Sequence, residues 1–119
     1  MALWLAIKPV AADIPPGVGA FVAHWHDVNR RRMQIFYSGS VQGVGFRYTV
    51  KSVATGFEIT GTVGNLPDGR VELVAEGAPD ELEGFRLAIR ESGLEHFIRQ
   101  EEVKWTESQN EFRGFEIVR

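Results

Sequence analysis

The sequence contains no cysteine and no apolar run long enough to cross a bilayer. Without cysteine there are no disulfides, no thiolate catalysis and no zinc–thiolate site, and the composition is typical of a reducing compartment. A membrane helix needs ~20 apolar residues, and no segment approaches that length. The apolar and charged fractions, 44% and 24%, are those of a globular protein. A chain of 119 residues has room for one domain with one core.

Charge is divided unevenly along the chain. Residues 1–32 carry a net charge of +2 and residues 33–119 a net charge of −5. An acidic domain repels nucleic acid and anionic membranes, so we expect neither as a partner. We also expect the protein to be a monomer. An anionic substrate would have to be held by a local cluster of hydrogen-bond donors.

Residues 1–32 show no sustained periodicity and are interrupted by prolines and glycines. We interpret them as an irregular extension, followed by a domain over residues 33–119, with Met33 placed like a natural start. The apolar first seven residues are too short for a secretory signal, so we expect a cytoplasmic protein. His24 and His26 alternate as metal ligands can, but no third ligand lies near them, and we expect no metal site. The run of basic residues 30–32 is too short for a nucleic-acid patch.

From Met33 onward, strand-like and helix-like patterns alternate. A β-rich composition predicts strands over residues 34–41 and 115–118, and apolar alternation predicts strands over residues 58–65, 70–76 and 97–107. Helical spacing predicts one helix that ends near Gly56 and a second from Pro79 to Gly93. The sequence L-P-D-G at residues 66–69 predicts a tight turn. The resulting order, β-α-β-β-α-β with a terminal strand, is an α+β, ferredoxin-like fold with an antiparallel sheet and two helices on one face.

Two glycines stand between the first strand and the first helix. Backbone that curls there can turn successive N–H groups inward, and the helix N-terminus adds partial positive charge. Arg47, in the first helical turn, adds a planar fork of donors suited to phosphate oxygens. The candidate phosphate-binding loop consists of Gln42, Gly43, Val44, Gly45, Phe46 and Arg47. Taken alone, it fits a plain glycine turn as well as an anion site. Dinucleotide and Walker A loops are excluded, because Tyr48 replaces the third glycine and Gly-Lys-Ser/Thr is absent.

Asn65 ends the second strand, just before the predicted turn. Taken alone, an asparagine there is a turn former. In the expected topology the first two strands are neighbours or near-neighbours, so Asn65 can lie close to the loop. Its amide has a donor and an acceptor, which suffice to hold one water in line with a phosphorus.

The two motifs together resemble a known family. The sequence VQGVGFR at residues 41–47, followed by GxVxNxxDGxVE at residues 61–72, is similar to the acylphosphatase signature, and the resemblance extends over about residues 33–119. It implies an enzyme that hydrolyses acyl phosphates to a carboxylate and inorganic phosphate without a metal or other cofactor. It also implies that Arg47 and the loop bind the phosphate and that Asn65 orients the attacking water.

The residues are compatible with this chemistry. A carboxylate leaving group has a conjugate acid of pKa about 4 and departs without a general acid, and the sequence shows no convincing acid or base near the loop. We expect Lys51 and His96 to be solvent-exposed rather than catalytic.

Three other functions compete with this interpretation. A non-catalytic anion-binding or regulatory module would keep the loop but would not need Asn65. An RNA-binding domain would need exposed aromatics on its central strands and a basic face, and this sequence supplies neither. An acylphosphatase module of a larger carbamoyl-transferring maturation protein would be followed by further domains, which we do not expect after Arg119.

Overall fold

The computed structural model describes residues 29–119, so His24, His26 and the rest of the extension up to residue 28 lie outside the described residues. The element order is the predicted one. The strands are β1 (Arg31–Gly39), β2 (Ile59–Asn65), β3 (Val71–Gly77), β4 (Ile98–Glu107) and β5 (Phe115–Val118), and the helices are α3 (Phe46–Ala54) and α4 (Pro79–Ile89). Two short turns, η1 (Arg90–Leu94) and η2 (Glu95–Phe97), connect α4 to β4.

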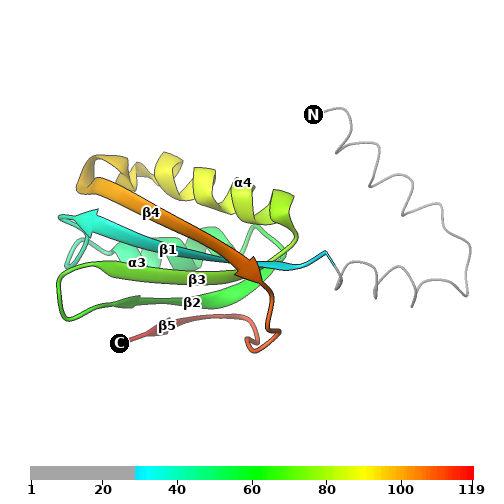
Figure 1. Ribbon diagram of the computed structural model, residues 1–119. Coiled ribbons are helices and arrows are strands. Elements are labelled where there is room, and N and C mark those ends of the chain that lie inside the picture. Colours follow the sequence, from blue (N-terminus) through cyan, green and yellow to red (C-terminus); the bar gives the residue numbers. More distant parts are fainter. Residues whose placement is uncertain (1–28) are drawn as a thin grey trace, which may run out of the picture.

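The strands form one sheet in the order β4-β1-β3-β2-β5 (Figure 1). The first four strands pair antiparallel, as predicted. The terminal strand β5 instead pairs parallel to β2, which makes the sheet mixed. Because β1 and β2 are both antiparallel to β3, they run in the same direction and both end at the edge of the sheet where β3 begins. This edge brings together the segments that carry the two sequence motifs.

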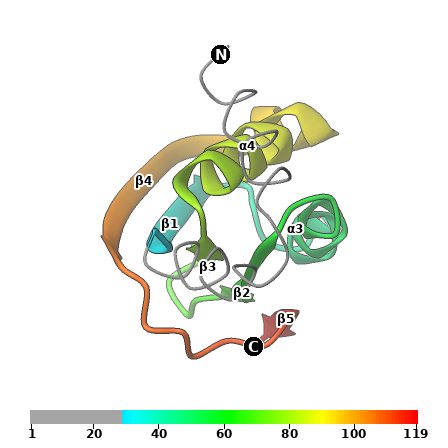
Figure 2. The same cartoon turned by 90° about the vertical axis from the view of Figure 1, so that its right-hand side faces the viewer.

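Both helices cover the same face of the sheet (Figure 2). Helix α3 packs on β2 and β5, and α4 packs on β3 and on α3. Each helix buries an apolar stripe at helical spacing, as an amphipathic helix does. The buried residues are Phe46, Val50 and Ala54 in α3 and Leu82, Phe85 and Ile89 in α4.

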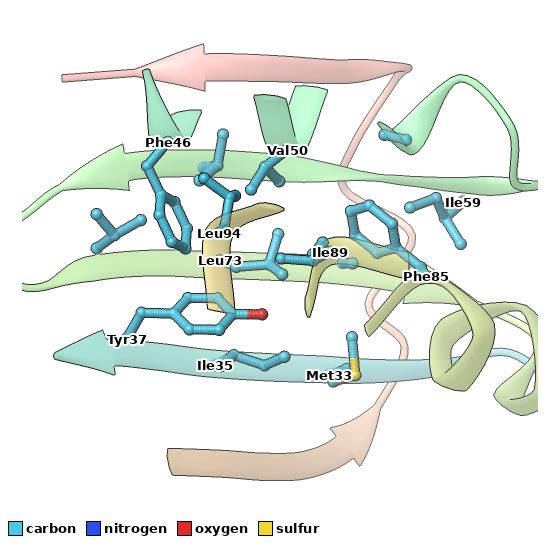
Figure 3. Close-up of a cluster of buried hydrophobic side chains, with 14 of the residues drawn as sticks. Met33, Ile35, Tyr37, Phe46, Val50, Ile59, Leu73, Phe85, Ile89 and Leu94 are labelled. Carbon is cyan, nitrogen blue, oxygen red and sulfur yellow. The ribbon is translucent and has the colours of Figure 1, made fainter. Parts of the chain in front are cut away.

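The core lies between the helices and the sheet (Figure 3). Alternate residues of β1, namely Met33, Ile35 and Tyr37, are fully buried in it, because successive side chains of a strand point to opposite faces. Burying a large apolar side chain contributes about 1.5–3 kcal/mol, so this row of residues stabilises β1 in the centre of the fold. Burial also raises the pKa of the Tyr37 phenol above its usual value of 10.0.

The other face of the sheet is partly covered by the segment between β4 and β5, which is held by Glu76. This β3 carboxylate is fully buried. It accepts hydrogen bonds from the backbone nitrogens of Gln109 and Asn110 at 2.8 and 3.0 Å, from Ser108 Oγ at 3.0 Å and from Arg32 Nε at 2.8 Å. Burial by itself raises the pKa of Glu76, but the hydrogen bonds from Gln109, Arg32 and Ser108 outweigh it and lower the pKa below its usual 4.5. Glu76 therefore fastens the segment that leads into β5.

No helix in the part of the chain that the structure describes is long and apolar enough to cross a membrane.

Candidate active site

The loop between β1 and α3 has the backbone that its glycines predict. Gly43 and Gly45 adopt left-handed φ angles of 80° and 76°, a conformation that residues with a Cβ rarely take. Gly45 caps α3 and its backbone oxygen accepts the first helical hydrogen bond, from the nitrogen of Thr49 at 2.9 Å. The first amides of a helix have no partner within the helix, so those of α3 face the loop. The loop and helix end together form a positively polarised cradle.

Buried side chains at both ends hold this loop in place. Val41 is fully buried and Phe46 is 2% exposed, and the rings of Phe46 and Tyr37 lie 5.0 Å apart in the core. The side chain of Gln42 turns away from the cradle and donates hydrogen bonds to the backbone oxygens of Leu66 and Arg70, each at 2.9 Å. Gln42, predicted as a loop residue, thus fastens the loop to the hairpin that follows Asn65.

Arg47 lies in the first turn of α3, and its Nη1 donates a 2.7 Å hydrogen bond to the backbone oxygen of Arg119. The side chain of Arg119 in turn donates to the backbone oxygen of Asn65 at 3.2 Å and to Glu72 at 3.1 Å. Arg119 therefore connects the candidate arginine to the candidate asparagine. Sequence reasoning missed this residue, since it belongs to neither motif.

Asn65 is the last residue of β2, paired with Val71 of β3. Its side-chain Oδ1 is buried and has no hydrogen-bond partner among residues 29–119. The neighbouring Gly64 is needed for packing, because a Cβ there would lie 2.3 Å from the backbone oxygen of Val118. The absence of a side chain at Gly64 thus lets β5 approach β2 and bring Arg119 beside Asn65.

Arg47 and Asn65 line one pocket of about 160 Å³ at the ends of β1 and β2. Its other lining residues are Val41, Gly43, Gly45, Phe46, Tyr48 and Ile117. The structure therefore brings the two predicted side chains together, although β3 lies between β2, which ends at Asn65, and β1, which leads into the loop before Arg47.

A larger groove of about 490 Å³ lies over α4 and β4. Its arginines are already paired, since Arg86 and Arg90 bind the two oxygens of Glu101 at 3.0 and 2.7 Å. Further carboxylates, Glu83 and Glu95, lie within 4 Å of these arginines. The groove has no excess of positive charge, so it is a poor anion site despite its size.

The remaining candidates lie apart from the pocket. Lys51 is exposed, one turn along α3 from Arg47. His96 is exposed as well, and its ring packs on Phe97 with centroids 4.3 Å apart. Across residues 29–119, no group of three or more His, Asp or Glu side chains is placed to hold a metal ion.

Taken together, the fold and the pocket are those of a small ferredoxin-like domain with a helix-capping loop suited to an anion. Residues 33–117 match the acylphosphatase family. The chain is 42% identical over 86 residues to an acylphosphatase of Archaeoglobus fulgidus, covering 72% of this chain and 96% of that one. It is 41% identical over 88 residues to an acylphosphatase of Trichormus variabilis, covering 74% and 86%.

The fold is similar as well. The crystal structure of acylphosphatase from Bacillus subtilis superposes with a TM-score of 0.69 at 35% identity, covering 75% of this chain and 99% of that one. This chain belongs to the acylphosphatase family, and it is an enzyme that hydrolyses acyl phosphates. The predicted fold class, family and activity are thereby confirmed.

Proposed function

We propose that the pocket between Arg47 and Asn65 is where this acylphosphatase binds the phosphoryl group and attacks it with water. The single observation that carries the proposal is that both side chains line one pocket at the N-terminus of α3. The loop amides of residues 43–47 and the Arg47 guanidinium surround the phosphoryl oxygens. Charge spreads over these oxygens in the transition state, where donors that are already oriented have their largest effect.

Asn65 holds the attacking water in this proposal. Buried polar atoms in proteins almost always have a hydrogen-bond partner, and the buried Oδ1 of Asn65 lacks one among the described residues. The Asn65 side chain lines the pocket, so a water held by its amide would sit in the pocket beside the phosphorus. The backbone of Asn65 is fixed by Arg119 at 3.2 Å and by its pairing with β3, so the side chain starts from a rigid strand end.

The reaction then needs no general acid. The water oxygen bonds to phosphorus, the bond from phosphorus to the acyl oxygen breaks, and its electron pair leaves with the carboxylate. The two protons of the water leave with the phosphate. Because the leaving carboxylate is a weak base, with a conjugate acid of pKa about 4, it departs unprotonated. The positive charge that phosphoryl transfer requires comes from Arg47 and the amides, so we propose that no metal ion is required.

The leaving-group argument can be tested with two substrates. Benzoyl phosphate releases a carboxylate, whereas phenyl phosphate releases a phenolate whose conjugate acid has a pKa of about 10. We expect kcat/KM for benzoyl phosphate to exceed that for phenyl phosphate by at least ~10³-fold, because the carboxylate is a much weaker base than the phenolate and leaves more readily. Each ~1.4 kcal/mol of barrier is tenfold in rate. A chelator should not change either rate. Equal rates on the two substrates, or activity lost to chelator and restored by a divalent cation, would contradict the proposal.

The cytoplasmic location, the monomeric state and the boundary between residues 32 and 33 stay predictions from the sequence.

A further inference from the structure

The pocket has room for the phosphoryl group but for little else. Its volume is about 160 Å³, and a protein cavity of about 150 Å³ holds a single benzene-sized molecule. A phosphorus with its oxygens and the attacking water is already a group of that size. The acyl part of the substrate must therefore lie at the mouth of the pocket.

The direction in which the acyl group points follows from which residues line the pocket on the side of the sheet and which on the side of the loop and α3. Asn65 and Ile117 belong to the sheet, whereas the other lining residues belong to the loop and α3. In phosphoryl transfer the attacking and leaving oxygens lie roughly in line, on opposite sides of the phosphorus. If water is held at Asn65, the acyl group points away from the sheet, toward the loop and the first turn of α3.

On that side, the exposed side chain that also lines the pocket is Tyr48. It follows Arg47 directly, lines the pocket and is 77% exposed, the most exposed large apolar residue of the described chain. The loop beside Tyr48 carries no side chain at Gly43 or Gly45, and the space there is open, since a Cβ added at either position would meet no described atom within 4 Å. The ring of Tyr48 is thus open to a group that lies across the mouth.

We propose that Tyr48 binds the acyl group of the substrate, so that this enzyme prefers acyl phosphates with an aryl group to those with a small acyl group such as acetyl. The inference rests on the proposed function, since it assumes that the phosphoryl group occupies the pocket. An aryl acyl group can pack against the Tyr48 ring in the offset or edge-to-face geometry that aromatic pairs favour. An acetyl group offers one methyl to the same surface and gains little.

The test is the ratio of kcat/KM for benzoyl phosphate to kcat/KM for acetyl phosphate. In Tyr48→Ala we expect this ratio to fall about tenfold, equivalent to ~1.4 kcal/mol. Tyr48→Phe keeps the ring and should keep the ratio within about twofold. Leu87→Ala, which removes an exposed apolar side chain from α4, is the matched control and should change neither rate.

Tyr48→Lys, which has a long side chain without a ring, is a second variant in which the same ratio of kcat/KM values is measured. Thermal melts check that each variant is folded. A ratio within twofold of the parent in both Tyr48→Ala and Tyr48→Lys would overturn the inference, as would an equal loss on both substrates. A parent protein that hydrolyses neither substrate would contradict the proposed function itself. A parent that hydrolyses both, with kcat lowered by Arg47→Lys but a ratio insensitive to Tyr48, would contradict this inference alone.

Discussion

The side-chain nitrogen of Gln42 donates a 2.9 Å hydrogen bond to the backbone oxygen of Arg70 and an equal one to Leu66. One residue of the candidate phosphate loop is thereby fixed to both ends of the hairpin turn that follows Asn65. This contact lies outside the pocket, and it fixes the two halves of the site, the phosphate loop with Arg47 and the strand end with Asn65, relative to each other.

We predict that Gln42→Glu impairs both halves of the site at once. The variant would place a carboxylate against two carbonyl oxygens, so the free energy of unfolding should fall by about 1–3 kcal/mol. Phosphate affinity and kcat should both fall, by about tenfold, because small displacements of catalytic groups are costly. Gln100→Glu, the same change at an exposed position of β4, is the control and should stay within about 0.5 kcal/mol. Parental affinity and turnover in Gln42→Glu would show that the contact does not position the site.

Because of Glu76, the free energy of unfolding should decrease as the pH falls into the acidic range. Its pKa is lowered in the folded protein, so its contribution is fully present above its usual pKa of 4.5 and is lost as the pH falls through the lower, folded value. Glu76→Gln should lower the free energy of unfolding at pH 7 by about 3 kcal/mol, because it disrupts a buried, hydrogen-bonded charge pair. The curves of parent and variant against pH should converge below pH 4.5. Denaturant unfolding across this range measures both effects, with exposed Glu102→Gln as the control; parallel curves would contradict the assignment.

The start of the domain can be tested by truncation. The sequence predicts that a chain starting at Met33 folds and keeps its activity. The structure adds that β1 begins at Arg31 and that Arg32 binds the buried Glu76 at 2.8 Å. We therefore expect the chain from Met33 to be active but to lose about 1–3 kcal/mol, which lowers Tm by roughly 5–20 °C in a domain of this size.

A chain that starts at Asn29 keeps Arg32 and is the matched comparison for this truncation. It should melt like the full-length protein. Loss of cooperative unfolding in the chain from Asn29 would show that earlier residues contribute to the core. Equal melting of the two truncated chains would show that Arg32 adds nothing to stability.

Elements with local sequence signals could be predicted closely. The terminal strand occupies residues 115–118 as expected, and Gly69 of the predicted turn has a φ of 96°. The first strand was less predictable: residues 34–41 were expected, whereas β1 is Arg31–Gly39. Arg32 belongs to the strand because its charge is compensated by Glu76, which is 44 positions away. Val41 was included in the predicted strand, but it lies in the loop after β1, where its side chain is buried.

In the site too, features with a local sequence signal were predicted and contacts between distant residues were not. Arg47 and Asn65 were predicted from residue type and position together with the resemblance to the acylphosphatase family, and they line the same pocket. The supporting contacts of Gln42 and Arg119 were not predicted, because they join residues 24 to 72 positions apart through backbone oxygens. A backbone acceptor leaves no signature in the residue type of the partner.

Arg47 and Asn65 have separate roles in the proposed mechanism, and substitutions should separate them. Arg47→Lys keeps a charge but loses the planar fork of donors. It should weaken phosphate binding and lower kcat together, the latter by ~10³-fold if Arg47 acts as arginine fingers do.

The most direct test of the mechanism is to measure phosphate affinity by calorimetry and kcat on benzoyl phosphate for Asn65→Ala, with a thermal melt to show that the variant is folded. Because this substitution removes the water-holding amide and leaves the phosphate cradle intact, kcat should fall by about a hundredfold. The affinity for inorganic phosphate should stay within a few-fold of the parent. A folded Asn65→Ala that turns over at the parental rate would show that Asn65 is only a turn residue and would contradict the mechanism.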